Sequence, residues 1–181
     1  MAEVGLQEHP KGAIRTGNIS DELARTPAHL AVVVVSPARP IFEGDAHWVT
    51  VPTWDRVGEE GGVRLRYAPT PPERLAVGLI GIWPGHAPIV AALGSGILRI
   101  GQEGGKIAPF AVRGGFLMVG DNKVTILVDN AVAEADVNAE EAKRELDETL
   151  EALRHPKSDA EFAELLDRRA WCEARLNLAE G

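Results

Sequence analysis

The stretch Leu30-Ala-Val-Val-Val-Val-Ser-Pro37 indicates the fold class of this chain. Its run of β-branched side chains favours a strand, and its Ser-Pro end is typical of a turn. Other short apolar stretches bounded by glycine, proline or asparagine predict further strands, at residues 40–44, 46–51, 79–83, 96–102, 106–112, 116–119 and 123–128. Because no helical pattern separates these stretches, we expect an antiparallel sandwich or barrel rather than a parallel sheet, which needs crossover helices.

Residues 54–78 form a distinct segment within this β region, and we treat them as an insertion. They contain several glycines and prolines together with four arginines, Arg56, Arg64, Arg66 and Arg74. The pattern predicts a small hairpin in which Thr53–Val57 pairs with Val63–Tyr67 across a glycine-rich turn.

The hydrophobic period changes to that of an α-helix after Ala135. Asn138–Glu141 and Ser158–Glu161 have the spacing of helix-capping boxes, and Pro156 separates the two helices that they begin. The apolar residues fall on one stripe of each helix: Ala139, Ala142, Leu146, Leu150 and Leu153 on the first, and Phe162, Leu165, Leu166, Cys172 and Leu176 on the second. Residues 136–181 are therefore predicted to form an antiparallel helical hairpin.

The composition argues against several classes of protein. The 181 residues carry a net charge of −8, which disfavours a nucleic-acid-binding protein. The longest apolar runs are far shorter than the ~18 residues that a membrane helix needs. A single cysteine, Cys172, permits no internal disulfide and favours a reducing compartment. Residues 1–29 lack both the apolar core of a secretory signal and the basic character of a transit peptide, so we expect a solvated N-terminal extension.

The residue types that serve catalysis or metal binding are present, but without the spacing that these functions need. The five histidines show no metal-ligand spacing, and Cys172 has no CxxC partner. The sequence contains no nucleophile elbow, P-loop or complete dinucleotide-binding motif. Acidic pairs such as Glu140-Glu141 are typical of a solvated helix surface rather than of a catalytic cleft. We therefore expect no metal, no cofactor and no independent enzymatic activity.

The most specific stretch is Gly81-Ile-Trp-Pro-Gly-His-Ala-Pro88, and five further blocks follow the same family pattern in order: Val34–Pro37, Ile41–Gly44, Gly96–Ile100, Gly114–Phe116 and Lys123–Val128. With these blocks the chain resembles the epsilon subunit of the F-type ATP synthase, which is called delta in mitochondria. The resemblance runs from Leu30 to the C-terminus and implies a β-sandwich of about ten antiparallel strands followed by an α-helical hairpin. It thus implies an extension at 1–29, a sandwich domain at 30–135 that contains the insertion, and a hairpin at 136–181.

The resemblance also implies a function, that of a non-catalytic rotor component. In the family, the sandwich binds the gamma subunit and sits on the membrane-embedded c-ring, so that proton-driven rotation of the ring turns gamma. The hairpin either folds on the sandwich or extends along gamma to the alpha and beta catalytic subunits, where it inhibits ATP hydrolysis. The implied location is peripheral, on the cytoplasmic face of the bacterial inner membrane.

The resemblance places a contact with the c-ring or gamma in the Gly81–Pro88 block. The residues concerned are Gly81, Trp83, Pro84, Gly85, His86 and Pro88. The alternative is that Pro84-Gly85 is a turn that His86 caps or packs against. Leu79 stands where the family often has a carboxylate, and we hypothesise that the arginine-bearing insertion adds contacts to the ring or to gamma.

Two further features of the hairpin bear on nucleotides and inhibition. Relatives that bind ATP have an Asp and an Arg at the positions of Asn138 and Glu141. Because the cation that would pair with phosphate is missing here, we expect no nucleotide binding. Near the C-terminus, three basic residues are candidates for inhibitory contacts, with an ordinary helix-end charge cluster as the alternative: Arg168, Arg169 and Arg175.

The sequence leaves one other function open. The chain would then be a free-standing β-sandwich binding module whose insertion at 54–78 grips a small ligand. Co-purification with gamma and the catalytic subunits distinguishes a rotor subunit from such a module.

Overall fold

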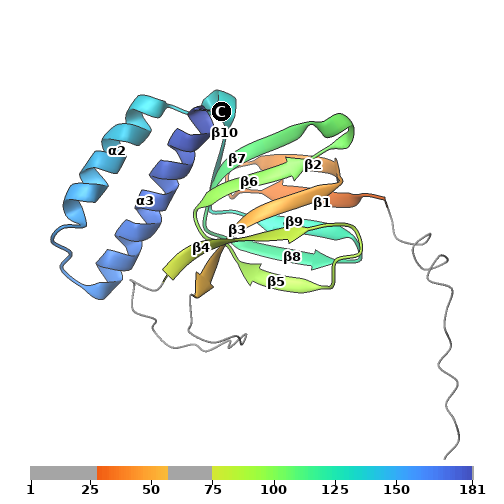
Figure 1. Ribbon diagram of the computed structural model, residues 1–181, viewed down its shortest axis with the longest axis horizontal. Helices are drawn as coiled ribbons and strands as arrows, with labels where there is room; N and C mark the ends of the chain where they lie inside the picture. Colours follow the sequence, from red (N-terminus) through yellow and green to blue (C-terminus); the bar gives the residue numbers. More distant parts are fainter. Residues whose placement is uncertain (1–27, 57–74, 181) are drawn as a thin grey trace, which may run out of the picture.

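The computed structural model describes residues 28–56 and 75–180, which form two five-stranded sheets and a helical hairpin (Figure 1). The strands are β1 (Leu30–Val35), β2 (Pro40–Ala46), β3 (Trp48–Arg56), β4 (Leu75–Ile82), β5 (Ile89–Ala92), β6 (Gly96–Gly101), β7 (Ile107–Arg113), β8 (Phe116–Gly120), β9 (Lys123–Leu127) and β10 (Asn130–Ala133). The helices are the short 3-10 turns η2 (Glu103–Gly105) and η3 (Glu134–Asp136) and the α-helices α2 (Ala139–Ala152) and α3 (Asp159–Ala179).

The two sheets stack face to face, so the predicted β-sandwich is confirmed. One sheet, which we name the open sheet, has the order β2-β1-β9-β8-β5. The other, which we name the helix-bearing sheet, has the order β10-β7-β6-β3-β4. All described strand pairs are antiparallel except β1 and β9, which run parallel with Val32 opposite Val124.

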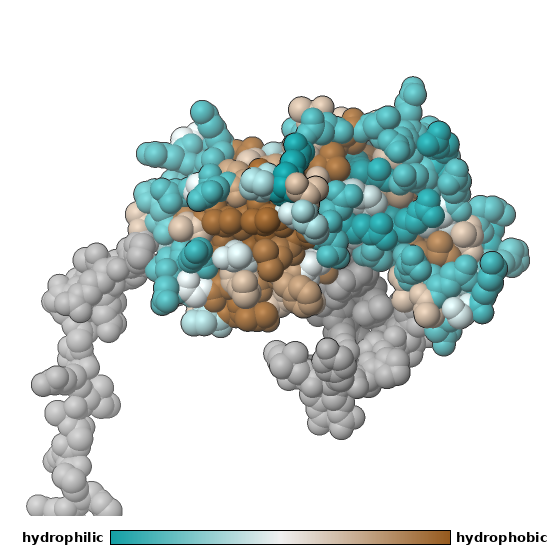
Figure 2. Space-filling view, turned by 180° about the vertical axis from the view of Figure 1, so that it is seen from behind, coloured by the Kyte–Doolittle hydropathy of each residue, from teal (hydrophilic) through white to brown (hydrophobic). Residues whose placement is uncertain are grey.

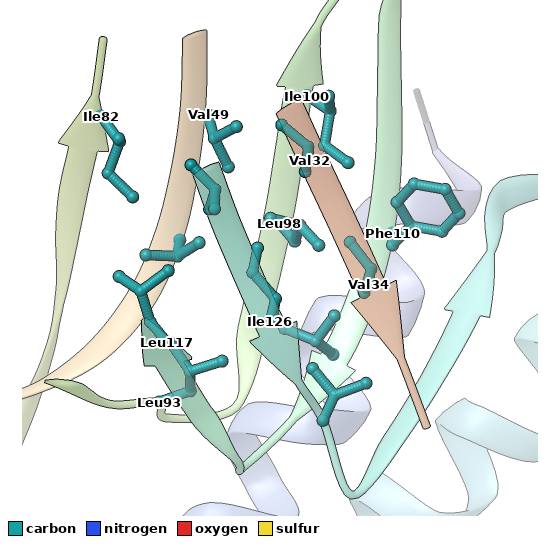
Figure 3. Packing of buried hydrophobic residues seen from close by; sticks show 14 of the residues in the cluster. Val32, Val34, Val49, Ile82, Leu93, Leu98, Ile100, Phe110, Leu117 and Ile126 are labelled. Atoms are coloured by element: carbon teal, nitrogen blue, oxygen red, sulfur yellow. The ribbon is translucent and has the colours of Figure 1, made fainter. Parts of the chain in front are cut away.

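The core lies between the sheets because each strand alternates inward and outward side chains. Leu30, Val32 and Val34 of β1 are fully buried, while the residues between them are not. In Figure 3, Val32 and Ile126 from the open sheet meet Leu98 from the helix-bearing sheet. The buried cluster between the sheets contains no residue of α2 or α3, so the sandwich has a core of its own.

Three parts of the β region differ from the prediction. The short strands β5 and β10 were not predicted from their sequences, Ile-Val-Ala-Ala and Asn-Ala-Val-Ala. The expected partner of Thr53–Val57 is wrong, because Thr53–Arg56 pairs with Leu75–Gly78 in a long β3–β4 hairpin. The other half of that prediction, Val63–Tyr67, lies outside the described residues.

The helical hairpin is confirmed, including both of its caps. Asn138 Oδ1 accepts a hydrogen bond from the Glu141 backbone N–H at 3.1 Å. Ser158 Oγ accepts one from the Glu161 N–H at 3.1 Å, which satisfies donors that the first turn of a helix otherwise leaves unpaired. Within the described ranges, neither α-helix is long and apolar enough to cross a membrane.

The hairpin contacts the sandwich through α3, and α2 lies on the outer side of α3 (Figure 1). A second apolar cluster joins them, in which Ala111 of β7 meets Trp171, Ala174 and Leu178 of α3. None of these α3 residues was on the predicted apolar stripe. The predicted apolar stripe of α2 is only partly buried, since Leu150 is 43% exposed.

The turn between β7 and β8 requires glycine, and this requirement generates a prediction. Gly115 has φ +112°, and a Cβ there would strike the carbonyl oxygen of Leu127. Gly104 also has positive φ, +73°, but a Cβ there meets no atom within 4 Å. We expect Gly104→Ala to lower the free energy of unfolding by about 1–2 kcal/mol and Gly115→Ala by more than about 3 kcal/mol. Urea unfolding of both variants measures the difference, and equal losses would contradict it.

Candidate functional site

The outward face of the open sheet carries exposed apolar side chains. Val90, Phe116, Met118 and Leu127 are 73%, 58%, 42% and 43% exposed, and we name them the outer apolar face. Cross-strand register places Val90 beside Met118 and Phe116 beside Leu127. They therefore form a continuous surface across β5, β8 and β9, rather than scattered single residues.

This surface has no covering element among the described residues. Figure 2 views the molecule from the side opposite to Figure 1 and shows apolar residues concentrated over the sandwich, while the hairpin is mostly hydrophilic. The register continues it onto β1, where Val35 lies beside Leu127. Contiguous exposed apolar surface on a globular domain typically marks a site of protein association.

The loop between β4 and β5 contains a tight turn at Pro84-Gly85. The His86 N–H donates to the Trp83 carbonyl oxygen at 3.0 Å, and Gly85 has φ +82°, which is the geometry of a type II turn with proline first and glycine second. The Gly85 N–H donates to Asn122 Oδ1 at 2.6 Å, which ties this loop to the β8–β9 turn. The two loops thus form one braced end of the sandwich.

Gly81 and Trp83 have a joint packing role at the edge strand β4. A Cβ at Gly81 would overlap the six-membered ring of the Trp83 indole, so the glycine lets that ring lie against the strand. Trp83 is nevertheless 56% exposed, and Leu79, two residues before Gly81 on the same side of the strand, is 65% exposed. The indole is therefore held in place and still available to a partner.

The strand ends that bound residues 57–74 lie at the opposite end of the β3–β4 pair from this turn. In the β3–β4 pairing, Val49 lies opposite Ile82 near the Pro84-Gly85 turn, whereas Arg56 lies opposite Leu75 at the far end. The strand ends that bound residues 57–74 are thus about a strand length from His86. Residues 57–74 of the insertion lie outside the described part of the chain, so the hypothesis about its contacts stays a prediction.

The three candidate inhibitory arginines all have carboxylate partners in this arrangement. Arg168 lies 3.9 Å from Glu148, and Arg169 lies 2.9 Å from Glu173. Arg175 is only 9% exposed and pairs with Glu145 of α2, and its guanidinium carbon lies 5.1 Å from the centre of the Trp171 ring. Arg168 and Arg169 are accessible at the surface, whereas Arg175 is enclosed between the helices.

The Arg175 pair shifts the ionisation of its neighbours. Burial would raise the pKa of Glu145, but the hydrogen bond and positive charge of Arg175 outweigh it, so the pKa is lowered. Burial raises the pKa of the Cys172 thiol, and Arg175 offsets this only in part. The Cys172 side chain is enclosed and its thiolate is disfavoured, which argues against a reactive cysteine.

The remaining sequence-based expectations concern nucleotides and metals. Asn138 and Glu141 lie at the start of α2, where the Asn138 side chain caps the helix. No group of three or more His, Cys, Asp or Glu side chains that could hold a metal ion occurs in the described ranges.

Comparisons with known proteins agree on one family. The model of the family described as "ATP synthase, Delta/Epsilon chain, beta-sandwich domain" matches residues 74–134. The ATP synthase epsilon chain of Leptospira interrogans is 34% identical over 131 residues, which cover 72% of this chain and 83% of that protein. The epsilon chain of Synechococcus elongatus is 30% identical over 149 residues, which cover 82% and 92%.

A solved structure shares the fold. A chain in the Euglena gracilis mitochondrial ATP synthase structure, which contains OSCP, F1 and the c-ring, aligns with a TM-score of 0.61 at 22% identity. The alignment covers 97% of this chain and 91% of that chain.

The Glu145–Arg175 pair predicts a pH-dependent stability. Because folding lowers the pKa of Glu145, the pair stabilises the fold above the ordinary value of 4.5 and loses this effect as the pH falls through the lower folded value. At pH 7 we expect Glu145→Gln to lower the free energy of unfolding by about 1–2 kcal/mol, less than for a fully buried pair. The difference from wild type should shrink below pH 4.5.

Chemical denaturation at several pH values measures this effect. Glu148→Gln is the matched control, because Glu148 is 62% exposed and lies 3.9 Å from its partner. We expect the control to change stability by less than about 0.5 kcal/mol. A loss for Glu145→Gln that is equally large at pH 3 and pH 7 would contradict the assignment.

Proposed function

Because the chain belongs to the family of ATP synthase epsilon chains, we propose that it is a non-catalytic subunit of the rotor, which connects gamma to the c-ring. The three proposed parts are an N-terminal extension at 1–29, the sandwich with its insertion at 30–135, and the hairpin at 136–181. The membrane association is peripheral and arises through the complex. In a bacterial cell this places the chain on the cytoplasmic face of the inner membrane.

The outer apolar face is the observation that carries this proposal. Its side chains point away from a complete core, so they contribute little to the stability of the isolated sandwich. A partner that buries them gains the hydrophobic free energy that the isolated chain cannot. The gamma subunit is the partner we assign to this face, because a rotor shaft must hold the sandwich without slipping.

The braced end of the sandwich is the proposed contact with the c-ring. The turn at Pro84-Gly85 is hydrogen-bonded to Asn122, so each loop restrains the other when the c-ring transmits torque. Trp83 lies beside these loops, exposed, with its ring packed against Gly81. The residues of this proposed contact are Gly81, Trp83, Pro84, Gly85, His86 and Pro88.

The hairpin is the proposed inhibitory element toward the alpha and beta subunits. Arg168 and Arg169 are accessible while the hairpin lies on the sandwich. Arg175 reaches the catalytic subunits only after α2 separates from α3, because Glu145 and Trp171 enclose it. A free-standing ligand-binding module is the less favoured function, since it depends on the insertion at 54–78 and gives the outer apolar face no role.

A charge placed on the outer apolar face tests the gamma contact. We expect Met118→Glu to weaken binding to gamma at least about tenfold, because a carboxylate would be buried against an apolar partner. Leu150→Glu on α2 is the matched control, since Leu150 is 43% exposed and Met118 is 42% exposed. Pull-down of gamma with each tagged variant gives the measurement. Equal recovery of gamma with both variants would exclude this face as the contact.

Nucleotide binding gives a second test. The Asn138 side chain is engaged as the α2 cap, and Glu141 adds negative charge where a phosphate would need a cation. We expect no binding of Mg-ATP at micromolar concentration to the isolated chain. Isothermal titration calorimetry checks this expectation, and a micromolar dissociation constant would overturn it.

A further inference from the structure

We propose that Asp167 is a polar latch that holds the helical hairpin on the sandwich and lets it leave again. Asp167 lies in the middle of α3, on a helix that otherwise contacts the sandwich through apolar side chains. The proposal concerns the isolated chain, so it stands or falls independently of the proposed partners.

Both carboxylate oxygens of Asp167 are engaged by the sandwich. Oδ1 accepts a hydrogen bond from Ser95 Oγ at 2.6 Å. Oδ2 accepts one from Arg113 Nε at 3.1 Å. Ser95 lies in the β5–β6 connection and Arg113 ends β7, so one α3 side chain ties together two places on the sandwich.

These bonds are the side-chain hydrogen bonds between the hairpin and the sandwich within the described ranges. Ser95 is 1% exposed, and the Asp167 side chain is 22% exposed. A carboxylate in such a position is stable only while its donors stay in place. The contact therefore favours one docked position of α3 over positions shifted along the sheet.

The contact between α3 and the sandwich, which we name the joint, has an apolar part that is small and separate from the sandwich core. Trp171, Ala174 and Leu178 pack on Ala111, and none of them belongs to the buried cluster between the sheets. Undocking thus exposes the joint without opening the sandwich. After separation, water can hydrogen-bond to Ser95, Arg113 and Asp167. The polar contact therefore adds less to the cost of separation than the loss of one partner would cost while the other groups stay buried.

Hydrogen exchange on the isolated full-length chain tests the latch. We expect Asp167→Asn to speed exchange of the α2 and α3 amides about tenfold, because the charge-assisted bond to Arg113 is lost. Exchange in β1, β8 and β9 should not change, because the core between the sheets is untouched. Glu164→Gln is the matched control, since Glu164 is exposed on the same helix and the substitution removes the same charge.

A second substitution separates a latch from a general loss of stability. Ser95→Ala should speed exchange of the helices less than Asp167→Asn, because the bond to Arg113 is kept. Both substitutions act on the same contact, so we expect the double variant to exchange more slowly than two independent effects would give. Unchanged exchange in Asp167→Asn, equal acceleration of the β-strands, or fully additive effects would each overturn the proposal.

Discussion

The structure depends on a constraint that alternation imposes on two stacked sheets: each sheet has one face in the shared core and one face outside it. The helix-bearing sheet covers part of its outside with α3. The open sheet leaves Phe116 and Met118 outside, in alternation along β8 with the buried Leu117 and Val119. Polar residues would serve the isolated sandwich equally well at those outer positions. The apolar character of Phe116 and Met118 is therefore best explained by a partner surface that lies against them.

The sequence predicts the strands whose alternation is strong and misses those that depend on a neighbour. β1 and β9 were predicted because their runs are long and β-branched. β5 and β10 have four residues each, and they form because β8 and β7 offer paired backbone groups. The partner of Thr53–Arg56 was missed because its pairing residues, Leu75–Gly78, follow the insertion. Local propensity carries no information on such a distant register.

The functional surfaces were predictable to different degrees. Phe116–Val119 is apolar at every position, so a strand there must present an apolar side chain to both faces, and this signal could have revealed the outer apolar face. The interface between α2 and α3 gives no such signal. Its centre is the pair of Glu145 with Arg175, which are 30 residues apart, and helical periodicity assigns both to a solvated face. Only the packing of α2 on α3 shows that they meet.

The chain thus presents two interfaces of opposite chemistry, and the contrast bears on how each would be used. The outer apolar face is formed by the apolar side chains of Val90, Phe116, Met118 and Leu127, and an apolar interface suits an association that persists. The joint under α3 combines a small apolar cluster with a carboxylate that water can also solvate. Interfaces of this smaller, more polar kind are typical of contacts that open and close. A sandwich held firmly on one side can therefore release its hairpin on the other without loosening its own attachment.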